Sequence, residues 1–212
     1  AQLTEYFARN FKINERSTAA REASARPTML KSLGRLEYAV SMVLEMLDRD
    51  YRLETLGARP TYHIPDDAQA EASMRALLLE IDRTAALGAD TLRLNGRDIP
   101  VRARGNGVIW FDFEALCDGP RSKVDYVELS RSFHTLLLSG MPRFDAESED
   151  AARRLVELID ELYDRRVNVI VSAAAPANEL YQGDRLAEDF VRTASRLHEF
   201  QSEDYLASAH RP

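Results

Sequence analysis

The sequence contains almost no cysteine and no long hydrophobic run. Cys117 is the only cysteine among 212 residues, so no internal disulfide can form and no cysteine-rich zinc site can be built. A reducing, cytoplasmic environment is the simplest expectation. No stretch of about 18 uncharged apolar residues occurs, so we expect no membrane span.

Positive charge is also in deficit. The chain has 28 Lys and Arg residues against 35 Asp and Glu residues, which gives a net charge of −7. Binding to nucleic-acid phosphates requires a basic surface, so this balance argues against a general nucleic-acid-binding protein. The 45% hydrophobic and 30% charged composition is that of an ordinary globular chain with one or two domains.

Lysine is the scarcest basic residue, and its positions exclude one common nucleotide-binding motif. A Walker A loop has the pattern G-x-x-x-x-G-K-[ST], in which backbone amides and the lysine hold the phosphates. The three lysines are Lys12, Lys31 and Lys123, and none follows a glycine. The sequence therefore carries no Walker A motif.

The apolar strands do not end in the acids of a Walker B motif either. V-I-W-F-D-F-E offers Asp112, but this residue is better placed as the N-cap of a following helix. Ser139 and Ser172 end the other two apolar segments, at positions where a magnesium site would need acids. Ser172 also lacks the G-x-S-x-G pattern of a nucleophile elbow.

No metal or thiol chemistry is indicated. The four histidines show neither H-x-x-x-H nor HExxH spacing, so we predict no metal site. Cys117 lies in an apolar turn and is expected to be a buried core thiol rather than a nucleophile.

Hydrophobic periodicity predicts two regions. Residues 1–48 are expected to be a helical N-terminal segment, because apolar residues recur at three- and four-residue intervals over 29–47. Residues 49–212 alternate between strand and helix patterns. The expected helices are 66–87, 113–118, 125–133, 145–166 and 186–200. The expected strands are 51–56, 105–113, 134–139 and 167–174, together with a hairpin over 91–101 that turns at Asn95-Gly96. We predict an α/β fold with parallel βαβ layers and a β-hairpin.

Two arginines in the last long helix are candidate functional residues. Arg192 and Arg196 are four residues apart and therefore share one helix face. Such a pair can clamp a phosphate, including one bound by a neighbouring subunit. The alternative is an exposed pair that forms ion pairs with Glu188, Asp189 and Glu199.

Several segments together resemble the C-terminal part of the ZapE family of AAA-type ATPases. These are FDFEALCDGPRSKVDYVELSRSFHTLLLSGMP, LIDELYDRRVNVIVSAAAPANELY and FVRTASRLHEFQSEDYL, preceded by a D-Y-R triplet at Asp50 to Arg52. The resemblance covers residues 49–207. The family's Walker A and Walker B motifs belong upstream of this region and are missing here, and residues 1–48 carry no such resemblance. The chain is then a fragment, a fusion, or a descendant of a member that lost its motor half.

The resemblance implies an AAA-like ancestry for the fold and a role in ATP hydrolysis. ATP and magnesium would be bound by an upstream P-loop half, so this chain alone is expected to be inactive as an ATPase. Ser172 would occupy a sensor-like strand end, and Arg192 or Arg196 an arginine-finger-like position. In bacteria the family implies FtsZ as a protein partner, and its mode of action allows a homo-oligomer.

Two other functions remain open from the sequence. The chain could be a stand-alone protein-interaction or adaptor domain with a degenerate AAA-like fold and no nucleotide role. The third hypothesis is a small-molecule enzyme, which would require a deep pocket lined by convergent polar groups.

Overall fold

The computed structural model describes residues 36, 38–40, 56–57 and 59–212. The chain divides into two compact units, residues 1–46 and residues 47–212. Within the helix expected at 29–47, the described residues Leu36 and Tyr38–Val40 are helical, and Val40 is exposed.

The strand expected over 51–56 falls mostly outside the described residues. Its last residue, Leu56, is helical and buried rather than extended. The first strand that the structure describes is instead Tyr62–His63, which sequence periodicity missed because two residues are too few to show alternation.

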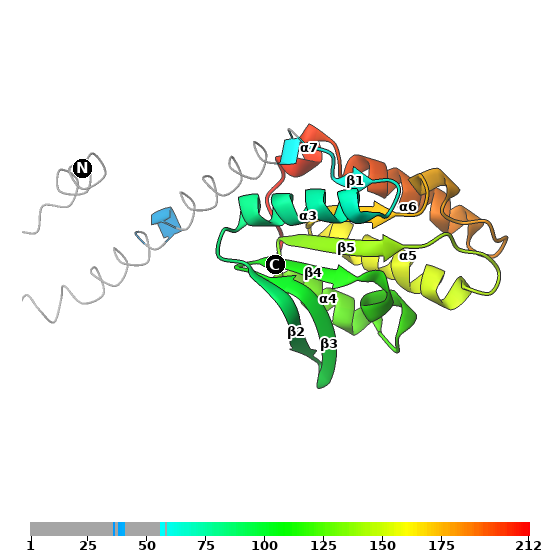
Figure 1. Ribbon diagram of the computed structural model, residues 1–212, viewed down its shortest axis with the longest axis horizontal. Helices are drawn as coiled ribbons and strands as arrows, with labels where there is room; N and C mark the ends of the chain where they lie inside the picture. The colour runs from blue at the N-terminus through cyan, green and yellow to red at the C-terminus, as the bar shows by residue number, and fades with distance from the viewer. Residues whose placement is uncertain (1–35, 37, 41–55, 58) are drawn as a thin grey trace, which may run out of the picture. The chain divides into compact units, whose positions relative to one another are not determined.

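The second unit alternates strands and helices along the chain (Figure 1). Its elements are β1 (Tyr62–His63), α3 (Ala68–Ile81), β2 (Ala86–Leu94), β3 (Arg97–Arg104), β4 (Val108–Asp112), the π-helix η1 (Glu114–Asp118), α4 (Lys123–Ser132), β5 (Thr135–Met141), α5 (Glu149–Asp164), β6 (Asn168–Ala173), the 3₁₀ turn η2 (Ala177–Glu179), α6 (Ala187–Glu199) and α7 (Glu203–Leu206). None of the helices in this described part is long and apolar enough to cross a membrane.

One six-stranded sheet organises this unit, in the order β1-β6-β5-β4-β3-β2. The first four strands in this order are mutually parallel, whereas β3 pairs antiparallel with both β4 and β2. The prediction of an α/β fold with parallel βαβ layers and a hairpin is therefore confirmed. Asn95 and Gly96 both have positive φ angles, 48° and 78°, as a type I′ hairpin turn requires.

Helices cover both faces of the sheet (Figure 1). In β4, Val108 and Trp110 pack with the residues of α3, whereas Ile109 and Phe111 belong to the larger core that contains α4, α5 and α6. The central strands are therefore buried on both faces, which explains why their sequences are apolar almost throughout.

Helix α3 is shorter than its sequence pattern predicts. Asp67 caps its start, and its carboxylate accepts hydrogen bonds from the backbone amides of the first turn. The predicted end at Leu87 is wrong, because the helix stops at Ile81. The carboxylate of Asp82 accepts backbone hydrogen bonds from Thr84 and Asn106, at 2.8 and 2.6 Å, and turns the chain into β2.

Candidate functional site

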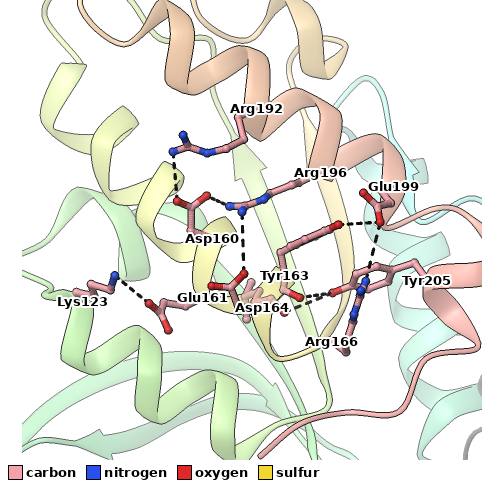
Figure 2. A network of polar contacts seen from close by, with 11 residues as sticks. Lys123, Asp160, Glu161, Tyr163, Asp164, Arg166, Arg192, Arg196, Glu199 and Tyr205 are labelled. Carbon is pink, nitrogen blue, oxygen red and sulfur yellow. Dashed lines mark hydrogen bonds and ion pairs between the residues drawn. The ribbon is translucent and has the colours of Figure 1, made fainter.

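The two arginines predicted from the sequence lie on the side of α6 that faces α5 (Figure 2). Arg196 forms an ion pair with Asp160 of α5 and lies 4.0 Å from the carboxylate of Asp164. Its guanidinium also lies over the ring of Tyr163, 4.7 Å from the centroid. With a side chain only 19% exposed, Arg196 is fixed between the two helices.

Arg192 is held more loosely than Arg196. Its Nη2 atom is 3.3 Å from Oδ2 of Asp160 and 3.1 Å from Oδ1 of Asp189, and its side chain is 50% exposed. Asp160 therefore uses one carboxylate oxygen for each arginine. Arg192 is the member of the pair that solvent, or a bound partner, can reach.

The alternative set of partners expected from the sequence is only partly correct. Asp189 does pair with Arg192, but Glu199 pairs with Arg166 and accepts a hydrogen bond from Tyr163. Glu188 forms no ion pair with any residue that the structure describes. The main counter-ion, Asp160, was missed because it lies 36 residues from Arg196 and no local spacing connects the two.

Tyr163 of α5 contacts both Arg196 of α6 and Tyr205 of α7. Two guanidinium groups lie over its ring, those of Arg196 and Arg166, and its hydroxyl donates to Glu199 at 2.8 Å. This hydrogen bond to a carboxylate raises the pKa of Tyr163. The ring also stacks on Tyr205 with centroids 5.6 Å apart.

Tyr205 closes the last turn of α5. Its hydroxyl lies within hydrogen-bonding distance of three backbone carbonyls, those of Leu162, Tyr163 and Val167. Because the ring is buried, the pKa of its hydroxyl is raised well above the ordinary value of a tyrosine. The two sequence motifs R-T-A-S-R-L and Q-S-E-D-Y-L are therefore parts of one packed network.

The carboxyl ends of the parallel strands present no set of magnesium ligands. The hydroxyl of Ser139 accepts a hydrogen bond from Nε1 of Trp110 at 2.8 Å. The hydroxyl of Ser172 donates to Asp66 at 2.5 Å and accepts from the backbone amide of Gly140 at 3.3 Å. Both serines are buried parts of the fold. Within the described part of the chain, no three His, Cys, Asp or Glu side chains are placed to hold a metal ion.

Asp112 does not cap the following helix, which corrects the sequence interpretation. The N-cap of η1 is Phe113, and the carboxylate of Asp112 instead accepts a hydrogen bond from Arg102 at 3.2 Å. Arg102 also pairs with Glu71 and lies over the ring of Trp110. Arg102 of β3 is therefore the ion-pair partner of Asp112 at the end of β4, and no spacing along the sequence indicates this pair.

These contacts lie at the edge of a cavity of about 470 Å³ between α3 and the hairpin of β2 and β3. Asp112 is neutralised by Arg102 at its edge, and the chain has no glycine-lysine loop. The residues present therefore do not fit a magnesium–nucleotide complex by themselves.

Cys117 is a core residue, as the sequence predicted. Its side chain is completely buried, and burial raises the pKa of the thiol. A neutral thiol without access to solvent cannot act as a nucleophile.

Comparison with known proteins gives the family. The model of the AFG1-like ATPase family matches residues 20–209, and so includes residues 20–48, for which the motifs gave no assignment. Over 161 residues the chain is 40% identical to the cell division protein ZapE of Escherichia coli K12, which covers 76% of this chain and 43% of that protein.

Two eukaryotic proteins are also similar. An uncharacterized protein of Schizosaccharomyces pombe is 29% identical over 158 residues, covering 74% of this chain and 35% of its own length. Lactation elevated protein 1 homolog B of Danio rerio is 29% identical over 184 residues, covering 71% and 37%. The chain thus spans less than half of the relatives it matches, and no solved structure matches it significantly. The family match covers most of the sequence, and the chain therefore belongs to the AFG1-like ATPase family.

Proposed function

We propose that this chain is the C-terminal region of an AFG1-like ATPase and couples ATP hydrolysis to a protein partner. ATP and magnesium would be bound by a P-loop half outside these 212 residues, and the protein would act in the cytoplasm. The name of the E. coli relative supports a role in cell division, with FtsZ as the partner to test first.

The observation that carries this proposal is the identity with ZapE over 43% of that protein. A second observation supports the proposal: the sequence contains no Walker A loop. A region of this kind contributes no phosphate-binding loop of its own. Its contribution to hydrolysis would be through surfaces and side chains offered to the nucleotide-binding half or to a neighbouring subunit.

We propose Arg192 and Arg196 as the residues that link this region to the nucleotide. An arginine that reaches a phosphate from a neighbouring subunit stabilises the charge of the transition state. Arg192 is half exposed and bound by two ion pairs longer than 3 Å, so it can exchange partners at small cost. Arg196 would act through its contact with Asp160, as a positioning residue for Arg192.

One observation favours the second candidate, a protein-interaction domain without a nucleotide role. The carboxylates of Asp160, Asp164 and Asp189 already neutralise both arginines. An arginine pair that is satisfied in this way can be purely structural.

Measurements of ATP turnover separate the two candidates. The isolated chain should show only background turnover, and turnover that Asp112→Asn abolishes would contradict the proposal. In the full ATPase, Arg192→Ala should lower turnover by roughly 10³-fold if the arginine contacts the nucleotide. Arg185→Ala is the matched control, because Arg185 is 80% exposed and, among the residues that the structure describes, forms an ion pair with Glu149 alone. Unchanged turnover in Arg192→Ala and Arg196→Ala would favour the interaction domain.

A further inference from the structure

The guanidinium of Arg192 is held by two carboxylates through a single nitrogen atom. Its Nη2 atom lies 3.3 Å from Oδ2 of Asp160 on α5 and 3.1 Å from Oδ1 of Asp189 on α6. Nη2 carries two N–H donors, one for each carboxylate. Among the residues that the structure describes, none accepts a hydrogen bond from Nε or Nη1 of this side chain. Arg192 therefore uses only part of its hydrogen-bonding capacity within the fold.

A phosphate group would compete with these carboxylates for the same nitrogen. Arginine binds phosphate and carboxylate groups through two parallel N–H donors. The end of the guanidinium presents Nη1 and Nη2 side by side, and Nη2 is the atom that Asp160 and Asp189 already bind. An end-on phosphate contact therefore requires that Arg192 give up at least one of its two ion pairs.

Asp160 keeps a counter-ion when Arg192 leaves it. Its other oxygen binds Arg196, whose side chain is 19% exposed and lies over the ring of Tyr163, 4.7 Å from the centroid (Figure 2). The pair of Asp160 and Arg196 is therefore part of the packing between α5 and α6. A substitution of Asp160 would disturb both arginines at once.

Asp189 differs from Asp160, because Arg192 is its only ion-pair partner among the described residues. Its side chain is 41% exposed and lies in the first turn of α6. The positive end of the helix dipole stabilises a carboxylate at this place, and water can solvate it when Arg192 leaves. Asp189 can therefore release the guanidinium without leaving a buried charge unpaired. An exposed pair of this kind shifts an equilibrium by about twofold to fivefold.

From this geometry we propose that Asp189 restrains Arg192 and thereby regulates its access to the nucleotide. The carboxylate binds Nη2 while no phosphate is within reach, and it is displaced when a phosphate binds that nitrogen. Asp189 does not touch the nucleotide and acts through Arg192, as a positioning residue. This role of Asp189 rests on the function proposed above for Arg192.

The restraint should affect kcat rather than KM. An arginine that stabilises the charge of the transition state contributes little to binding of the ground state. The contact with Asp189 is then lost only as the transition state forms, so it adds to the activation barrier. Removing the carboxylate should therefore raise kcat and leave the KM for ATP unchanged.

ATP turnover by the full ATPase tests the restraint. Asp189→Asn keeps the size of the side chain but removes its charge, and we expect kcat to rise about twofold to fivefold with KM unchanged. Glu188→Gln is the matched control, because Glu188 carries the same charge in the same first turn but forms no ion pair with a described residue. The control should leave both constants unchanged. Circular dichroism should show that both variants are folded.

A double variant shows whether the gain depends on Arg192. Asp189→Asn combined with Arg192→Ala should turn over ATP no faster than Arg192→Ala alone. A faster double variant would overturn the proposal, because the acid would then act independently of the arginine. A fall in kcat in Asp189→Asn would also overturn it, because the carboxylate would then hold Arg192 in its productive position.

The same variants separate the restraint from the proposed function. If Arg192→Ala lowers turnover while Asp189→Asn and Glu188→Gln behave alike, the restraint is wrong and the role of Arg192 stands. If Arg192→Ala leaves turnover unchanged, both are wrong.

Discussion

Asp160 of α5 and Arg196 of α6 form an ion pair of intermediate burial, in which 30% and 19% of the two side-chain surfaces are exposed. The second carboxylate oxygen of Asp160 binds Arg192. One acid therefore organises both arginines of the R-T-A-S-R-L motif.

Asp160→Ala should destabilise the protein, because it leaves Arg196 without its closest counter-ion between two helices. A pair of intermediate burial implies a loss of about 1–2 kcal/mol in the free energy of unfolding. Urea denaturation measures this loss. Asp164→Ala is the control, since Asp164 is 67% exposed and 4.0 Å from Arg196, and it should change stability by less than about 0.5 kcal/mol. Equal effects of the two variants would show that Asp160 has no special role.

Asp125 should make stability depend on pH in the acid range. Burial by itself raises its pKa, but hydrogen bonds from Asn95 and Ser122 and the charge of Arg97 outweigh burial, so its pKa lies below the ordinary value. The carboxylate therefore stabilises the fold above about pH 4, and this contribution is lost as the pH falls through the folded-state pKa.

Asp125→Asn should cost about 2–3 kcal/mol at neutral pH, because it weakens hydrogen bonds to a charged group whose side chain is 1% exposed. Denaturant titrations at a series of pH values should show the variant and the unmodified chain converging as the pH falls below about 4. A constant difference at every pH would contradict the assignment of the effect to this carboxylate.

Tyr205 should make the protein sensitive to alkaline pH. Its pKa is raised in the folded state by burial, so its contribution is present below the unfolded-state pKa of about 10 and lost as the pH rises beyond it. Tyr205→Phe should lose about 1 kcal/mol near neutral pH, from the missing hydroxyl contacts. Its stability should then fall less steeply than that of the unmodified chain between pH 9 and 11, as thermal unfolding can measure. An equally steep fall would rule out Tyr205 as a source of the pH dependence.

The core beneath α3 should be sensitive to lost volume. Leu137 of β5 is completely buried in the cluster that packs against α3, so Leu137→Ala should cost about 2–5 kcal/mol. Leu87→Ala, at a leucine that is 38% exposed, should cost less than about 1 kcal/mol. Chemical denaturation of both variants compares the two positions. If the two variants lost similar amounts of unfolding free energy, the burial of Leu137 beneath α3 would contribute little to stability.

Much of the fold could be predicted because its signals are local. The turn at Asn95-Gly96 follows from the positive φ angles these residues tolerate, and the apolar segments of β5 and β6 follow from burial on both faces. The end of α3 could not be predicted in this way. Its sequence is compatible with further helix, but Ala86 pairs with Arg104 in the adjacent strand, and that pairing is not visible locally.

The candidate site likewise has features that follow from the local sequence and contacts that depend on the tertiary structure. The sequence by itself determined that the chain has no glycine-lysine loop and that Arg192 and Arg196 share one helix face, because both properties depend on composition and helical spacing. Only the tertiary structure decided that Asp160 binds both arginines and that Asp112 pairs with Arg102. These partners come from other elements of the fold, and it is chain packing, not spacing along the sequence, that brings their charges together.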